Sequence, residues 1–162
     1  MGCLGCGKCK DTLQCWYGED MVNEFLNKVK DTDGFVFGTP IHFAGTSGAI
    51  KCFMDRAFCS KLSIYANKPA AAIVSCRRGG AQGGFEDMNR YFTISNMPVI
   101  SSEYWNEVHG NTAEEAAKDE EGMQTMRYIG YNMGWLLQCI ALGKSAGIEP
   151  QKESKIRTNF IR

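Results

Sequence analysis

Apolar and polar positions along the chain predict strands and helices in alternation. Two short apolar runs, Phe35–Thr39 and Ala70–Ser75, are typical of strands buried on both faces, because such strands carry nearly continuous apolar sequence. We predict a third strand over Pro98–Ser102. Segments with helical apolar spacing separate these runs, so the pattern indicates an α/β fold with a parallel sheet covered by helices on both faces.

Helices are predicted from apolar spacing and from capping residues. Asp20 can cap the first helix. Thr112 with Glu115 forms a capping-box signature for one long helix, whose apolar stripe runs from Met123 to Ile140. The other predicted features are helices over residues 21–29, 50–58 and 85–92, and an extended polar tail over the last dozen residues.

Three unusual loops follow the predicted strands, and the carboxyl ends of parallel strands are where such sheets bind ligands. The first loop consists of Thr39, Pro40, Ile41, His42 and Phe43. The second consists of Cys76, Arg77, Arg78, Gly79 and Gly80. The third follows Ser102 and contains Tyr104, Trp105 and His109. We expect the first two loops to lie side by side at one edge of the sheet.

Length and charge limit the classes of function. The 162 residues suit one domain over 1–162. Lysine plus arginine equal aspartate plus glutamate at 18 each, so no net charge favours nucleic acid or an anionic membrane. No apolar run approaches the ~18 residues that a membrane span needs. We expect a cytoplasmic protein that binds neither nucleic acid nor membrane.

Eight cysteines are many for such a chain, and four of them fall within the first fifteen residues. Cys3, Cys6, Cys9 and Cys15 have the spacing C-x2-C-x2-C-x5-C. Thiolates at every third residue suit a [4Fe–4S] cluster, whereas structural zinc usually takes two separated pairs. Plain reduced thiols are the alternative. The other four, expected to be small core residues, are Cys52, Cys59, Cys76 and Cys139.

The segment Gly38–Gly48, followed by Phe53-Met54-Asp55-Arg56, resembles a signature of flavodoxin-like NAD(P)H-dependent FMN reductases. The cysteine segment, Arg77–Gly80, Tyr104-Trp105 and the ending 156–162 are similar to the same family, so the resemblance covers essentially the whole chain. The cysteine spacing also resembles iron–sulfur flavoproteins, which are relatives on the same fold.

This resemblance implies an FMN cofactor, NAD(P)H as electron donor, and a quinone, flavin or similar small molecule as acceptor. It places the first loop against the flavin ring. It places Arg77 to Gly80 at the pyrimidine end, where positive charge stabilises the reduced flavin; either arginine can alternatively bind NAD(P)H phosphates. Tyr104, Trp105 and His109 are candidates for contact with substrate or with a neighbouring subunit. The family also implies a homodimer or higher homo-oligomer, and no catalytic side chain is required.

Family members begin with a strand, a Ser/Thr-rich phosphate loop, a helix and a second strand, and none of these precedes Cys3. The resemblance therefore predicts a flavodoxin-like doubly wound sheet that lacks its first βαβ unit, as in a fragment of a longer protein. We accordingly expect weak FMN binding and an unpaired edge along Phe35–Thr39. Two alternatives stay open: an iron–sulfur flavoprotein that exchanges electrons with a protein partner, and a cofactor-free remnant that only packs against partners.

Overall fold

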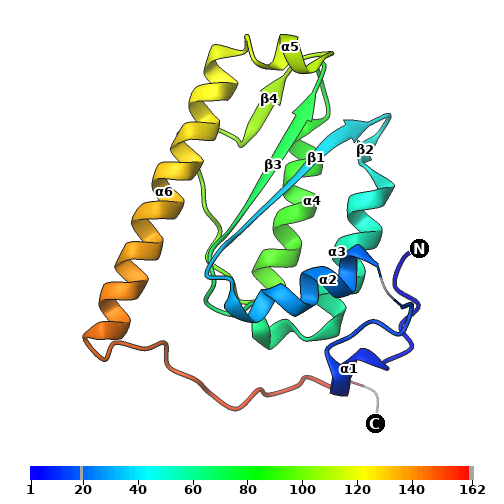
Figure 1. Cartoon of the computed structure of the whole chain (residues 1–162), viewed down its shortest axis with the longest axis vertical. Coiled ribbons are helices and arrows are strands. Elements are labelled where there is room, and N and C mark those ends of the chain that lie inside the picture. The colour runs from blue at the N-terminus through cyan, green and yellow to red at the C-terminus, as the bar shows by residue number, and fades with distance from the viewer. Residues whose placement is uncertain (19, 161–162) are drawn as a thin grey trace.

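The computed structural model, described over residues 1–18 and 20–160, contains a four-stranded sheet with strand order β2-β1-β3-β4 (Figure 1). The strands are β1 (Phe35–His42), β2 (Gly45–Thr46), β3 (Ala70–Cys76) and β4 (Glu107–His109). β1 pairs with β3 and β3 with β4 in parallel, while β2 folds back antiparallel onto β1. The predicted α/β class with a mostly parallel sheet is confirmed.

Helices cover both faces of this sheet. Figure 1 shows α6 alone on one side, with α2, α3 and α4 on the other. The α-helices are α1 (Cys9–Thr12), α2 (Met21–Lys28), α3 (Gly48–Ser60), α4 (Ala81–Ile94), α5 (Ala113–Ala116) and α6 (Glu120–Ser145). Short 3₁₀ turns, η1 (Val29–Asp31) and η2 (Leu62–Ile64), follow α2 and α3. In the described chain, no helix is both long and apolar enough to cross a membrane.

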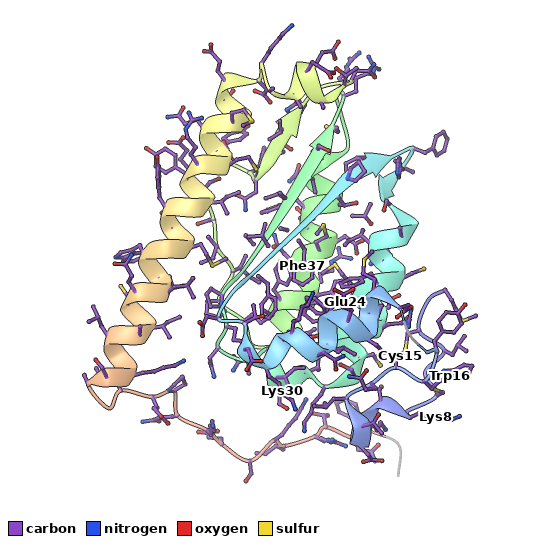
Figure 2. All side chains as sticks on the ribbon, in the orientation of Figure 1. Lys8, Cys15, Trp16, Glu24, Lys30 and Phe37 are labelled. Carbon is purple, nitrogen blue, oxygen red and sulfur yellow. The ribbon has the colours of Figure 1, made fainter. Side chains whose placement is uncertain are left out.

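Side chains of β1 and β3 divide between the two faces because successive strand residues point in opposite directions. Phe37 lies in the larger core, with its ring centroid 5.6 Å from that of Phe58 in α3 and 5.5 Å from that of Phe92 in α4 (Figure 2). On the other face, Ala71 packs with Ile129 of α6 in a second, smaller cluster. This alternation holds helices against both sides of one sheet.

The strand predicted over Pro98–Ser102 is wrong. Only an isolated parallel bridge joins Val99 to Ala70, and the regular pairing is made further along the chain by β4. The reason is Asn106, a fully buried residue whose side-chain amide donates to the carbonyl oxygens of Ala72 (3.0 Å) and Ile100 (3.2 Å). Its side chain thus occupies a carbonyl of β3 that a continuing strand would use.

The long helix predicted from Thr112 is two helices. Thr112 does cap a helix, accepting a hydrogen bond from the Glu115 amide (3.3 Å), but that helix is the four-residue α5. A second cap, Asp119, then starts α6 by accepting from the Gly122 amide (3.0 Å). The same carboxylate accepts from the His109 amide (2.7 Å), so a contact with a residue ten positions earlier fixes the break.

The other helices follow the predictions, apart from one boundary. α2 has the expected cap, since the Asp20 side chain accepts from the amides of Val22 and Asn23. α4 begins at Ala81, four residues before the predicted start, because Gly80 has a φ of +92° and makes the turn into the helix. Residues 148–160 carry no regular secondary structure, as expected for the tail.

β1 is unpaired along most of one side. β2 reaches only Ile41 and His42, so within the described residues no strand lies beside Phe35–Pro40 on the side away from β3. The expected open edge along Phe35–Thr39 is therefore present. Val36, on this stretch, has 55% of its surface exposed.

Candidate functional site

The parallel register brings the carboxyl ends of three strands to one edge of the sheet. Pro40 of β1 lies opposite Ser75 of β3, and Cys76 lies opposite His109 of β4. The first two predicted loops are therefore adjacent, as expected from their positions after buried strands. We call this place the carboxyl edge, defined by Thr39–Phe43, Cys76–Gly80 and His109.

The first of these segments is a hairpin and not the loop that was predicted. β1 continues through Pro40 to His42, and Ile41 pairs with Thr46 of β2. Phe43, at the tip, has a positive φ of +42° and a fully exposed side chain. The strand continues because the chain folds back at once, giving β1 a new antiparallel partner where its parallel pairing with β3 ends.

Two hydroxyl groups join this hairpin to the start of α3. The Ser47 amide donates to Thr39 Oγ1 (3.3 Å), and Ser47 Oγ accepts from the Ile50 amide (3.3 Å). Both side chains are buried. The Ser47 side chain thus caps α3, and its hydroxyl oxygen is already engaged as the acceptor of this hydrogen bond.

The second segment packs directly against the hairpin. A Cβ placed on Gly80 would lie 3.4 Å from Ile41 Cγ2, and one on Gly84 would lie 2.3 Å from Ile41 Cδ1. Glycine at these positions lets the first turn of α4 approach β1 closely. Arg77 and Arg78 precede that turn and are exposed. No side chain caps α4, so its first amides and the two guanidinium groups can meet an anion.

The third predicted loop is divided, because His109 ends β4 whereas Tyr104 and Trp105 precede it. His109 lies at the carboxyl edge, where its amide donates to Asp119. Hydrogen bonds from the Gly122 and His109 amides hold the pKa of Asp119 below its usual value. Tyr104 and Trp105 come before β4 instead of after a strand, and form an exposed edge-to-face pair with ring centroids 5.0 Å apart. Their separation from His109 follows from the wrongly predicted strand.

Hollows lie on both faces of the sheet beside the end of β1. One, of about 310 Å³, is formed by Gly38–Pro40 with Ser47, Ile50 and Phe53 of the α3 side. The other, also of about 310 Å³, is formed by Gly38–Pro40 with β3 and with Met126 of α6. The unpaired edge of β1 is thus flanked by space on either side, close to the carboxyl edge.

The N-terminal cysteines surround a separate, narrow hollow of about 30 Å³. Its sulfur-bearing residues are Cys3, Cys6, Cys9, Cys15 and Cys59. We call it the cysteine pocket. Within the described residues, no three His, Cys, Asp or Glu side chains converge closely enough to hold a metal ion. The four predicted ligands therefore share one pocket without forming a closed coordination site.

Cys59 corrects a prediction, because it is exposed and lines this pocket instead of the core. Its backbone carbonyl accepts from the Cys9 thiol (3.8 Å). Burial raises the pKa of the Cys59 thiol, and the neighbouring Cys3 raises it further. Cys139 is also exposed, whereas Cys76 is buried as expected and Cys52 is half-buried.

Arg56 is the residue of this pocket that sequence reasoning missed. Its side chain is 6% exposed, and Nη1 lies 2.5 Å from Asp20 Oδ2. Nε donates to Cys15 Sγ (3.3 Å), and the guanidinium lies over the Tyr17 ring at 5.0 Å. Its hydrogen bond lowers the pKa of Asp20. The available signal was an arginine among apolar residues of α3, but nothing in the sequence named its partners.

Helix α3 extends from the hairpin at the carboxyl edge to the cysteine pocket. Ser47, at its start, belongs to the hairpin, whereas Arg56 and Cys59 lie near its end. At 1.5 Å per residue the separation is about 15 Å along the helix axis. Figure 2 shows Lys8, Cys15 and Trp16 together in the N-terminal segment beside this end of the molecule.

Comparison of sequences gives relatives of one kind. An iron–sulfur flavoprotein of Methanocaldococcus jannaschii is 27% identical over 146 residues, covering 85% of this chain and 75% of the relative. One from Archaeoglobus fulgidus is 31% identical over 86 residues, covering 49% of this chain and 41% of that protein. One from Clostridioides difficile is 29% identical over 73 residues, and the match spans 32% of its length.

Solved structures show the same fold. RosB with the bound intermediate 8-demethyl-8-formylriboflavin-5'-phosphate superposes with a TM-score of 0.58 at 17% identity, covering 93% of this chain and 71% of that one. A flavodoxin-like WrbA-like protein from Agrobacterium tumefaciens gives a TM-score of 0.52 at 13% identity, covering 70% and 73%. The chain thus has a flavodoxin-like fold.

A family comparison agrees with the fold. Residues 4–112, more than half of the chain, match the NADPH-dependent FMN reductase family. That range contains Cys6, Cys9 and Cys15, the hairpin and the arginine loop. This protein belongs to the NADPH-dependent FMN reductase family.

Proposed function

We propose that this protein is an FMN-dependent oxidoreductase that passes electrons from NAD(P)H to a small acceptor such as a quinone or a free flavin. The observation that carries the proposal is the meeting of the Thr39–Phe43 hairpin and the Cys76–Gly80 loop at adjacent carboxyl ends of parallel strands. Ligands of open α/β sheets bind at such ends. Membership in the NADPH-dependent FMN reductase family supports FMN as the cofactor.

The residues of the carboxyl edge suit a flavin in shape and charge. A Cβ on Gly79 would meet no atom within 4 Å, so the backbone there is open to a ligand. Backbone groups of Thr39 to Phe43 would border the ring. When bound, FMN supplies the chemistry by accepting a hydride from a nicotinamide and passing on the electrons. Cys76 lies buried at the base of the second loop, where it supports the backbone.

The arginines give this site its charge. Arg77 and Arg78 are exposed beside the uncapped first turn of α4, and bidentate guanidinium contacts are well suited to phosphate. We assign them to the pyrimidine end of the flavin or to the phosphates of NAD(P)H. His42 is a candidate for substrate contact, and no side-chain nucleophile or general base is assigned.

Steady-state oxidation of NADPH with added FMN and a soluble quinone tests the assignment. Arg78→Glu is expected to raise KM for NADPH about tenfold or more, because a charge-assisted hydrogen bond is worth about 1.5–3 kcal/mol. Arg90→Glu is the control, since Arg90 is exposed on α4, the helix that follows Arg78, and its carboxylate contact, with Asp87, is at 3.9 Å. Equal effects of the two variants, or no FMN-dependent oxidation by the unaltered protein, would contradict the proposal.

A second candidate function is electron carriage by a [4Fe–4S] cluster together with FMN. The specific observation is that the four predicted cysteines all line one pocket, beside a buried arginine. Four thiols supply the ligand number and type that such a cluster takes, and a cation suits its negative charge. Since the sulfurs do not yet converge, the N-terminal segment would have to close around the cluster. The named relatives are iron–sulfur flavoproteins.

Anaerobic reconstitution with ferrous iron and sulfide tests this second candidate. We expect about four irons per chain, as a [4Fe–4S] cluster requires. Cys6→Ser should abolish the uptake, whereas Cys139→Ser, an exposed cysteine of α6 outside the pocket, should not. Uptake of stoichiometric zinc, or of no metal, would contradict the cluster and leave the cysteines as plain thiols. Visible absorption would also separate a flavoprotein from the cofactor-free alternative, which shows no bands.

We further propose a cytoplasmic homo-oligomer. Although one face of α6 packs on the sheet, its outer face carries an exposed apolar stripe. The stripe consists of Tyr128, Tyr131, Trp135 and Leu142. Spacings of three, four and seven residues keep these side chains on one side of the helix. Tyr104 and Trp105 are proposed as further contacts to substrate or subunit.

A further inference from the structure

The cysteine pocket contains a buried cation whose hydrogen-bonding capacity is only partly used. Arg56 is 6% exposed and gives Nη1 to Asp20 and Nε to the Cys15 sulfur. Nη2 is buried, and among the described residues it has no hydrogen-bond partner. Buried guanidinium donors are normally all satisfied, so an orphaned one on a residue that lines a pocket indicates a missing acceptor.

The surroundings of Arg56 indicate the chemistry of that acceptor. Besides Arg56, the described residues that line the pocket are five cysteines, two aromatic residues and small or apolar residues, with no carboxylate among them. Asp20 is already paired with Nη1, and it also caps α2. The group that completes Arg56 is therefore an anion held among sulfur atoms, and four thiolates bound to iron and sulfide form such an anion.

Local structure holds Arg56 in place. The guanidinium is fixed from one side by Asp20 and from another by the face of Tyr17 at 5.0 Å, a favourable cation–π distance. Its backbone belongs to α3, whereas the Cys15 sulfur that it contacts belongs to the N-terminal segment. Arg56 is thus a fixed point against which the cysteines of the N-terminal segment can be oriented.

We propose that Arg56 is a positioning residue for the cluster of the second candidate function, on which this inference rests. It orients Cys15 through Nε and offers Nη2 to a sulfur of the cluster. Hydrogen bonds to sulfur and nearby positive charge favour the reduced, more negative form, so Arg56 raises the reduction potential. It also slows the loss of iron, because outer-shell partners of metal ligands contribute to affinity.

The test uses the reconstituted full chain and two substitutions with opposite predicted effects. Arg56→Lys keeps the charge beside Asp20 but loses the Nε and Nη2 donors. We expect iron to pass to a chelator about tenfold faster, and the midpoint potential to fall by about 59 mV if the two redox forms differ tenfold in affinity. Asp20→Asn keeps a good helix cap but leaves Arg56 with more uncompensated charge, so the midpoint should rise.

Controls separate positioning from a structural role. Arg90→Lys, at an exposed arginine of α4, should change neither iron release nor the midpoint. Far-UV circular dichroism of each variant reports folding, and if Arg56→Lys does not fold, the Asp20→Asn midpoint decides alone: a rise supports the proposal and an unchanged value overturns it.

The outcomes distinguish this inference from the function beneath it. If the unaltered chain loads about four irons but Arg56→Lys retains the same midpoint and release rate, the role of Arg56 is wrong and the second candidate function survives. Faster release from both variants with unchanged midpoints would show a structural role and also overturn the inference. If the unaltered chain takes up no iron, both the second candidate function and the role of Arg56 are wrong.

Discussion

Replacing Asp119 by alanine should destabilise the fold by about 2–3 kcal/mol, because this carboxylate starts α6 and also fixes the end of β4. It accepts from the Gly122 amide at 3.0 Å and from the His109 amide at 2.7 Å. Loss of an N-cap costs about 0.5–2 kcal/mol, and loss of a hydrogen bond to a charged group about 1.5–3. Since the Asp119 side chain is 20% exposed, water will replace part of what is lost, which favours the lower part of the summed range.

The pH dependence of this effect has a definite sign. The pKa of Asp119 is lowered in the folded state by the Gly122 and His109 amides. A depressed pKa means that the ionised carboxylate stabilises the fold above the unfolded pKa of about 3.9, and that this contribution is lost as the pH falls through the folded pKa. Asp119→Asn keeps a cap but not the charge. Its deficit relative to the unaltered protein should be present at neutral pH and shrink below about pH 4.

Urea unfolding followed by far-UV circular dichroism measures both quantities. Glu153→Ala, in the exposed tail, is the control and should leave the unfolding free energy unchanged within about 0.5 kcal/mol. An Asp119→Ala variant within the same margin would refute the assigned role. So would an Asp119→Asn deficit that grows as the pH falls.

Three further outcomes are expected. Gly110→Ala should destabilise the fold by about 1–3 kcal/mol in thermal unfolding, because the new Cβ would lie 2.4 Å from the Ala116 backbone nitrogen; an unchanged melting temperature would contradict this close packing. Light scattering should show an oligomer at micromolar concentration, and Trp135→Glu on the exposed stripe of α6 should reduce its mass; a monomer before substitution would refute self-association. Val36→Lys should reduce aggregation in turbidity assays by charging the open edge of β1, and equal turbidity would argue against that edge as its cause.

Much of the fold could be predicted from sequence because local signals determine it. The apolar runs of β1 and β3 and the Asp20 cap each act within a few residues, and the structure confirms them. The adjacency of the hairpin and the arginine loop also followed, since parallel strands place their carboxyl ends at one edge.

Two of the errors arise from side-chain contacts that reach beyond one turn of helix or one strand pair. Asn106 takes the carbonyl of Ala72, 34 residues away, and thereby displaces the third strand. Asp119 binds the His109 amide and divides the long helix. Neither contact leaves a periodic pattern, so propensity and spacing alone could not predict it.

In the candidate site too, some residues were found from local motifs and others only from the folded structure. Motifs located the cysteines and the two loops proposed to border a flavin, but the ion pair of Arg56 with Asp20 spans 36 residues. Cys59 reaches the cysteine pocket only because α3 packs beside the N-terminal segment. The role of a single residue that contacts two separate motifs can be recognised only from the folded structure.

The most direct test of the central claim is an NMR titration of the ¹⁵N-labelled protein with FMN. We predict amide shift changes concentrated in the hairpin Thr39–Phe43 and the loop Cys76–Gly80, with a dissociation constant weaker than about a micromolar, or about 8 kcal/mol. Binding tighter than this would contradict the expected weak hold on the phosphate. Changes confined to other segments, or no change at millimolar FMN, would contradict the placement of the flavin at the carboxyl edge.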